Sequence, residues 1–229
     1  MINDIHAYRR ALADAFNNAG GCYHQIDLGD GIIINGEYDM QKVLKYYNLP
    51  HDLTGLSVLD IGTSTGFFAF EAARRGGQVT AIDIWSSETF DYIKYALELQ
   101  AEYVQKNIYD LDASFGQFDL VICGSLLLHL RDIFGAIQKI REVCNGTAIV
   151  STAAYNDPCC AQVACCEFYG ARANDGNYWT YWRVNAAGLA KMLLASGFSS
   201  VSAPIHFTLQ SEPSRKNYAV PHVVTSARV

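Results

Sequence analysis

The stretch from residue 57 to residue 85 constrains the fold of this chain most strongly. Residues 58–61 form a short apolar run, which is typical of a strand buried on both faces of a parallel sheet. A loop of small residues follows at 62–66. Apolar residues and alanines at helical spacing then continue over 67–75, and two glycines end the pattern. The order predicts a strand, a tight glycine turn and a helix.

A second strand completes this unit. Residues 79–82 form another apolar run that ends at Asp83, about twenty residues beyond Gly62. Nucleotide-binding βαβ units place a carboxylate at this point, where it accepts hydrogen bonds from a ribose diol. The spacing therefore predicts a nucleotide site with Asp83 at its edge.

The glycine turn differs from the dinucleotide fingerprint, in which glycines let a pyrophosphate approach the backbone. Ser64 occupies the place of the middle glycine, and Asp60 just before the loop repels a phosphate but suits a cationic ligand. On these residues the chain resembles class I S-adenosylmethionine-dependent methyltransferases. A plain strand-to-helix turn in another α/β domain is the alternative. The resemblance implies S-adenosylmethionine as cofactor, contacted by Asp60, Gly62, Thr63, Ser64, Gly66 and Asp83.

Further cofactor positions follow along the chain. Ile84 and Trp85 come directly after Asp83, where an apolar side chain lies against adenine or simply packs as a half-buried aromatic. The resemblance implies that a polar residue and the next backbone amide hold the adenine edge, which assigns Asn107, Ile108 and, more weakly, Tyr109. Ligands of open parallel sheets bind beyond the carboxyl ends of the strands, which places Gly124 and Ser125 near the methionine part.

The remaining periodicity predicts an α/β fold, with an irregular segment or small hairpin at 22–36. Further helices are expected at 2–18, 39–47, 88–101, 132–143 and 185–196, and further strands at 101–104, 118–123, 148–152, 199–209 and 220–227. The resemblance implies a Rossmann-like, seven-stranded, mostly parallel sheet with an antiparallel last strand and helices on both faces. We expect an N-terminal helical cap and connecting segment at 1–50, although packing of the first helix against the core explains its pattern equally well. The methyltransferase domain would span 51–229.

An insertion interrupts this plan at about 153–182. Nearly thirty residues between a strand and a helix are too many for a simple connection, which indicates a lid. Its aromatic residues suit a pocket for a flat or apolar small molecule. Together with the segment before the nucleotide unit, it supplies the predicted substrate-binding residues Tyr23, His24, Trp179 and Trp182.

His129 is the predicted general base, because it follows a strand end of the sheet. Packing is the alternative reading, since this histidine lies within an apolar run. Tyr155 and Asp157 from the lid are further catalytic candidates. Only an acceptor that must lose a proton needs any such base.

Charge and cysteine content exclude other classes. The 229-residue chain has 17 basic and 23 acidic residues, a net charge of −6, which disfavours nucleic acid as a partner. No apolar run is long enough for a membrane span and no signal peptide is evident, so we expect a cytoplasmic protein. The seven cysteines include a CC-x4-CC cluster without the spacing of a structural zinc site, so we expect no metal and no disulfide framework.

Several segments, among them 27–39, 49–85 and 118–132, are similar to the branch around the wobble-uridine tRNA methyltransferases and their small-molecule relatives. The resemblance implies methyl transfer to an oxygen or nitrogen of a small-molecule acceptor of natural-product type, because the acidic balance departs from the tRNA enzymes. Modification of the tRNA wobble uridine, a non-catalytic nucleotide-binding regulator and an NAD-dependent dehydrogenase remain the alternatives. A homodimer stays open as the oligomeric state.

Overall fold

A computed structural model describes residues 4–172, 178–212, 214, 216 and 218–229 of the chain. The helices are α1 (Ile5–Asn18), α2 (Gln41–Leu44), α3 (Phe67–Arg74), α4 (Glu88–Leu97), α5 (Ile133–Val143) and α6 (Ala186–Ala195), with short 3₁₀ turns η1 (Lys45–Tyr47), η2 (Ile108–Asp110), η3 (Leu127–His129) and η4 (Pro158–Cys160). The strands are β1 (Cys22–His24), β2 (Ile26–Asp27), β3 (Ile33–Ile34), β4 (Gly36–Tyr38), β5 (Ser57–Ile61), β6 (Gln78–Asp83), β7 (Glu102–Gln105), β8 (Phe118–Gly124), β9 (Cys144–Ala153), β10 (Cys166–Arg172), β11 (Tyr178–Val184), β12 (Ser200–Val201), β13 (Ile205–Gln210) and β14 (Ala219–Arg228).

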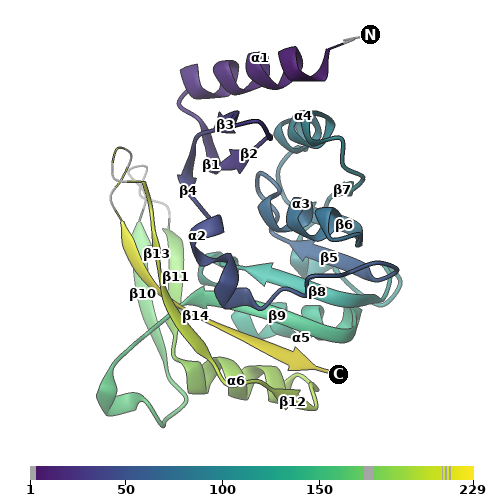
Figure 1. The fold of residues 1–229 in the computed structure, drawn as a ribbon. Coiled ribbons are helices and arrows are strands. Elements are labelled where there is room, and N and C mark those ends of the chain that lie inside the picture. The colour runs from purple at the N-terminus through teal and green to yellow at the C-terminus, as the bar shows by residue number, and fades with distance from the viewer. Residues whose placement is uncertain (1–3, 173–177, 213, 215, 217) are drawn as a thin grey trace.

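One central sheet organises the molecule (Figure 1). Its order is β12-β14-β9-β8-β5-β6-β7, and β13 also pairs with β14. The strands β5 to β9 run parallel to their neighbours, whereas β14 is antiparallel to β9. This confirms the predicted Rossmann-like sheet with its antiparallel last strand. All carboxyl ends of the parallel strands meet at one edge, where an open α/β sheet binds its ligands.

Helices cover both faces of this sheet, as predicted. Apolar residues of α3 and α4, such as Phe70 and Phe90, pack against one face with Val58 and Ile122. Residues of α5 and α6 pack against the other face. Because the strands are buried on both sides, their sequences are continuous apolar runs without alternation.

The prediction of one continuous strand at 199–209 is wrong. This part of the chain forms two strands, β12 and β13, with a break at 202–204. Pro204 has no backbone N–H to donate to the neighbouring strand, which explains the interruption. The helix expected at 88–101 also ends earlier, at Leu97, because Glu98 adopts a left-handed conformation with φ 55°.

The segment predicted as a lid contains an antiparallel hairpin of β10 and β11. Residues 173–177 of this segment lie outside the described residues. The hairpin rises beside β13 and β14 at the carboxyl edge of the parallel strands (Figure 1). A bridge between Ala154 and Val184 and the hydrogen bonds of Asn185 to both Cys160 and Cys165 fix its base to the sheet domain.

The N-terminal helix packs against α4. The Tyr8 and Tyr95 rings lie 4.9 Å apart, and Arg9 Nε donates to the Ala96 carbonyl at 2.7 Å. The following segment, β1 to β4, contains the expected small hairpin, β2 with β3, but also a parallel pair of β1 with β4. It is this segment that reaches toward the carboxyl edge of the sheet.

Gly66 in the glycine turn has no room for a side chain. Its φ is +95°, and a Cβ there would lie 2.5 Å from Phe70 and 2.8 Å from Phe90, both fully buried. Gly55 has a similar φ of +79° but no atom within 4 Å of such a Cβ. We therefore expect Gly66→Ala to lower the free energy of unfolding by about 1–3 kcal/mol more than Gly55→Ala, the usual cost of overpacking. Denaturant unfolding measures both, and equal losses would contradict the packing argument.

Candidate functional site

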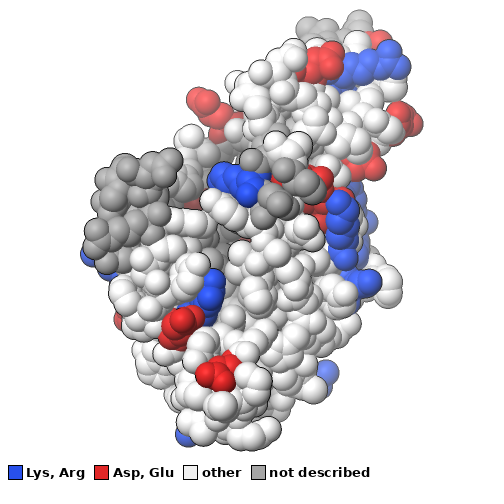
Figure 2. All heavy atoms as spheres, turned by 90° about the vertical axis from the view of Figure 1, so that its left-hand side faces the viewer, with Lys and Arg blue, Asp and Glu red and all other residues white. Residues whose placement is uncertain are grey.

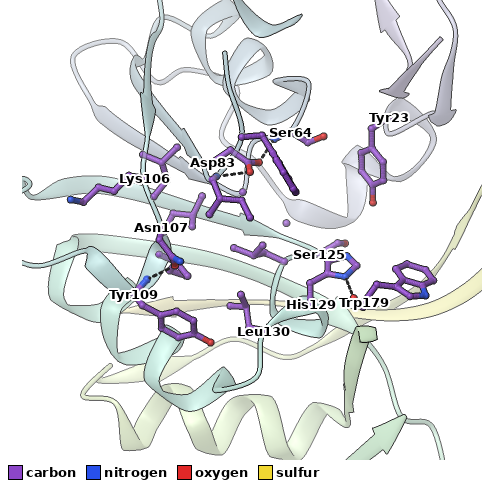
Figure 3. A pocket seen from close by; sticks show the side chains of 18 of the residues that line it. Tyr23, Ser64, Asp83, Lys106, Asn107, Tyr109, Ser125, His129, Leu130 and Trp179 are labelled. Atoms are coloured by element: carbon purple, nitrogen blue, oxygen red, sulfur yellow. Dashed lines mark hydrogen bonds between the residues drawn. The ribbon is translucent and has the colours of Figure 1, made fainter. Parts of the chain in front are cut away.

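A cavity of about 600 Å³ lies at the carboxyl edge of β5, β6 and β8 (Figure 3). Its lining comes from the glycine loop, from the residues that follow β6, β7 and β8, from β1 and from the lid hairpin. The lining residues are Tyr23, His24, Ile61, Gly62, Ser64, Ile82, Asp83, Ile84, Trp85, Lys106, Asn107, Ile108, Tyr109, Gly124, Ser125, Leu126, His129, Leu130 and Trp179.

Two backbone hydrogen bonds fix the side chain of Asp83 at the tip of β6. Its Oδ2 accepts a hydrogen bond from the Ser64 backbone N–H at 2.8 Å, and its Oδ1 accepts one from the Ile84 N–H at 2.7 Å. Ser64 adopts a left-handed φ of 50°, so the serine takes the conformation for which the family pattern uses glycine. The carboxylate thus ties the glycine loop to the neighbouring strand and lines the cavity.

Apolar side chains continue the cavity beyond this carboxylate. Ile84 is 51% exposed and Trp85 is 71% exposed, which leaves apolar area open beside Asp83. Across from them, Asn107 Oδ1 accepts from the Tyr109 N–H at 3.1 Å and so shapes the turn η2. An acid beside open apolar area matches an adenosine, with its ribose diol and flat base.

Ser125 lies at the middle of the cavity. Its φ of 58° is held by its backbone N–H, which donates to the Ser151 carbonyl at 3.0 Å. Ser151 Oγ in turn contacts the buried Tyr47 hydroxyl at 2.8 Å. The Ser125 hydroxyl is buried and lies close enough to the Tyr47 hydroxyl to act on the pKa of that phenol.

His129 lines the same cavity next to the lid. Its Nδ1 makes a short hydrogen bond to the Trp179 backbone carbonyl, and the two rings stack with centroids 5.8 Å apart. A carbonyl oxygen only accepts, so Nδ1 must carry the proton and Nε2 keeps a free lone pair. Burial lowers the pKa of His129, and the Trp179 carbonyl opposes this in part. The imidazole is therefore neutral at pH 7 and competent to accept a proton.

The cavity brings together most of the residues predicted from the sequence. The cofactor candidates on it are Gly62, Ser64, Asp83, Ile84, Trp85, Asn107, Ile108, Tyr109, Gly124 and Ser125, and the substrate and catalytic candidates are Tyr23, His24, Trp179 and His129. The sequence interpretation missed five lining residues, namely Ile61, Ile82, Lys106, Leu126 and Leu130. Lys106 follows β7 at the sheet edge, and the strand-end rule applied there would have found it.

Asp60 does not reach the cavity, contrary to the expected contact with a cationic ligand. It is buried, and its Oδ2 accepts from Thr63 Oγ1 at 2.7 Å and from the Ala69 N–H at 3.1 Å. The carboxyl group therefore caps the glycine turn and the start of α3. Thr63 and Gly66 likewise lie behind the loop and off the cavity. The charge that faces a ligand at this edge comes from Asp83 alone of the two acids.

Burial raises the pKa of Asp60 to about 7, although its hydrogen bonds to Thr63 and Ala69 act in the opposite direction. The folded state therefore binds this proton more tightly than the unfolded chain. The contribution of Asp60 to stability is full below its unfolded pKa near 3.8 and is lost as the pH rises through about 7. We expect Asp60→Asn, which keeps the shape without titrating, to remove this loss. The difference in free energy of unfolding between the two proteins, measured from pH 4 to pH 8, should shift in favour of Asn; a constant difference would contradict it.

Three other candidates lie off the cavity. Tyr155 donates its hydroxyl to Asp157 Oδ2 at 3.1 Å, and Asp157 also caps η4. Trp182 donates its indole N–H to the Arg131 carbonyl at 3.1 Å and packs against Phe168. These side chains fix the base of the segment that contains the β10–β11 hairpin and do not line the cavity.

Neither a metal site nor a membrane-spanning helix is found among the described residues. No three His, Cys, Asp or Glu side chains are arranged there to hold a metal ion. In the same part of the chain, none of the helices combines the length and the apolar character needed to cross a membrane.

Comparisons with known proteins agree with this geometry. Residues 58–146 match the family model described as "Methyltransferase domain". The chain is 34% identical over 122 residues to the ubiquinone biosynthesis O-methyltransferase of Rickettsia canadensis, covering 51% of this chain and 49% of that protein. It is 38% identical over 96 residues to the magnesium-protoporphyrin O-methyltransferase of Rhodobacter capsulatus, covering 41% and 42%. The chain thus spans about half the length of these relatives, and neither is a tRNA enzyme, so the tRNA branch is not supported.

Among solved structures, the N-terminal domain of EvdMO1 with S-adenosylhomocysteine bound superposes with a TM-score of 0.66. The match covers 96% of this chain and 97% of that one at 16% identity. At this identity the likeness establishes the fold, which is that of S-adenosylmethionine-dependent methyltransferases.

Proposed function

We propose that this chain, which carries a methyltransferase domain at 58–146, transfers a methyl group from S-adenosylmethionine to an oxygen of a small-molecule acceptor. One observation carries the proposal: a single cavity joins a nucleotide end, with Asp83 beside open apolar area, to an end with a neutral histidine, His129. Of the oxygen and nitrogen acceptors that the sequence leaves open, this histidine favours oxygen. A hydroxyl group must lose its proton on methylation, whereas a neutral amine attacks without a base.

The residues present fit the cofactor. Asp83 would accept from the ribose diol, Ile84 and Trp85 would cover the base, and Gly124 and Ser125 would lie beside the amino-acid part. When bound, S-adenosylmethionine supplies a methyl group on a sulfonium that becomes a neutral thioether. A dinucleotide fits less well, because Ser64 stands where the dinucleotide fingerprint has the glycine that lets a pyrophosphate approach the backbone.

His129 would take the hydroxyl proton on Nε2, since Nδ1 is engaged by the lid carbonyl. The residue is catalytic in this proposal, and Trp179 is a positioning residue because its carbonyl sets the tautomer. Trp179 lies on β11 and His129 on η3, so the histidine has the tautomer of a base only when these two elements are in contact. Proton transfer therefore depends on the position of β11.

Calorimetry separates this function from a dehydrogenase. We expect S-adenosylhomocysteine to bind with a micromolar dissociation constant, about 8 kcal/mol of binding free energy, and NAD to show no binding at millimolar concentration. Methyl transfer is then followed with labelled cofactor on a panel of hydroxyl acceptors. Tight binding of NAD alone would overturn the proposal. Binding of S-adenosylhomocysteine without transfer to any acceptor would instead favour a nucleotide-binding regulator.

A further inference from the structure

The two ends of the cavity differ in charge. Among the described lining residues, only Asp83 and Lys106 are charged side chains, and both lie at the nucleotide end (Figure 3). At the other end stand the lid residue Trp179 and the β1 residues Tyr23 and His24. Burial lowers the pKa of His24 to about 3 and raises the pKa of the Tyr23 phenol, so both side chains are neutral at pH 7.

Two aromatic rings border this uncharged end. Tyr23 is 38% exposed and Trp179 is 43% exposed, yet each is supported by a neighbouring ring. The ring centroids of Tyr23 and Tyr38 lie 5.1 Å apart, and the Trp179 ring stacks on the His129 ring. Figure 3 shows the two side chains at the same end of the cavity, with Tyr23 above Ser125 and Trp179 beside His129. Rigid aromatic rings with open area bind flat apolar ligands, because little rotamer freedom is lost.

One buried polar atom lies beside this end without a partner. His24 lines the cavity, and its Nδ1 is buried and makes no hydrogen bond in the described structure. A neutral imidazole suits a neutral ligand. It does not supply the cation that a buried carboxylate or phosphate requires.

The described cation beside Glu37 is already engaged in an ion pair. Glu37, which lies close enough to Tyr23 to act on its phenol, forms an ion pair with Lys216 at 2.9 Å and so occupies that lysine. Figure 2 shows the molecule from the side of β10 and β13, where Lys and Arg side chains lie close to Asp and Glu side chains at several places. Since the described lining residues at the acceptor end carry no positive charge, an anionic acceptor would be desolvated there without compensation.

We propose that the acceptor is a flat, uncharged aromatic compound with a hydroxyl group, bound between Tyr23 and Trp179. The inference rests on the proposed methyl transfer and narrows its substrate class. The ring of the acceptor lies between the two aromatic side chains, and its reacting hydroxyl faces His129. This inference excludes acceptors that carry a carboxylate or a phosphate group.

The test uses three probes of one skeleton on the full chain saturated with S-adenosylhomocysteine. These are 2-naphthol, the anion 2-naphthoate and the saturated decahydro-2-naphthol. Ligand-observed NMR titration at pH 7 should give at least tenfold tighter binding for 2-naphthol than for either other probe. Trp179→Leu and Tyr23→Leu should each weaken 2-naphthol at least fivefold and leave S-adenosylhomocysteine binding unchanged.

Tyr169→Leu is the matched control. Tyr169 is an exposed aromatic residue of the same hairpin, packed under the Arg183 guanidinium and away from the cavity, so this variant should bind all probes as the unaltered chain does. Equal or tighter binding of 2-naphthoate or of the saturated probe, or no binding of 2-naphthol at millimolar concentration, would overturn the inference while S-adenosylhomocysteine binding upholds the proposed function. Failure to bind S-adenosylhomocysteine would overturn both.

Discussion

Replacing His129 with alanine is expected to lower kcat for a hydroxyl acceptor by about 10² to 10⁴-fold, the usual contribution of a general base. The affinity for S-adenosylhomocysteine should change little, because the imidazole lies at the acceptor end. The unaltered chain should also lose activity as the pH falls through the pKa of His129, which burial sets below 6.5. The variant should show no such acid limb.

Initial rates from pH 5 to pH 9 measure both effects. His206→Ala is a suitable control, because His206 is an exposed residue on β13 and away from the cavity. A thiol acceptor that ionises in solution supplies a second control, since it needs no base and should react with the variant nearly as before. Turnover within about threefold of the unaltered chain on a hydroxyl acceptor would remove His129 from the mechanism.

The expected loss also shows what His129 does not do. A factor of 10² to 10⁴ corresponds to about 3–5 kcal/mol, whereas alignment of two bound reactants supplies about 7–11 kcal/mol. Positioning therefore dominates, and it depends on the whole cavity. The variant should keep measurable activity above the uncatalysed reaction for this reason.

The sequence predicted the sheet well because it depends on local patterns, and the same patterns selected candidate cofactor residues that line one cavity. Apolar runs of strand length, glycines at the turn and an acid at the tip of β6 are visible without any knowledge of the tertiary structure. Burial of Asp60 was not visible in the same way. Whether an acid at a strand end faces the ligand or caps the following helix depends on the direction of its side chain, which the spacing does not define.

The lid illustrates the same limit. Its length indicated an insertion, but pairing of β10 with β11 is a contact between two stretches of weak pattern. Trp179 and Trp182 were both assigned to the substrate. Only Trp179 lines the cavity. The hairpin register shifts between Tyr178 and Thr180, so the direction of the Trp179 side chain does not follow from its spacing to Trp182.

Replacing Asp83 with alanine is expected to weaken S-adenosylhomocysteine binding by about 100-fold or more. A carboxylate accepts about four hydrogen bonds, and the Ser64 and Ile84 N–H groups occupy two of these positions. Two positions remain for a ribose diol, and a hydrogen bond to a charged group contributes about 1.5–3 kcal/mol. The variant loses both bonds to the ligand and also frees the glycine loop that Asp83 holds.

Asp83→Asn separates these two contributions. The amide keeps one acceptor oxygen, but its NH₂ group faces one of the two backbone N–H donors, so we expect an intermediate loss of about tenfold, the value of one such bond. Asp112→Asn removes the same charge from an exposed loop and should leave binding unchanged. Calorimetry gives the affinities, and the unfolding midpoint shows whether the loop stays folded. If Asp83→Ala binds S-adenosylhomocysteine within threefold of the unaltered chain while remaining folded, the ribose does not lie at the tip of β6 and the nucleotide end must be assigned elsewhere.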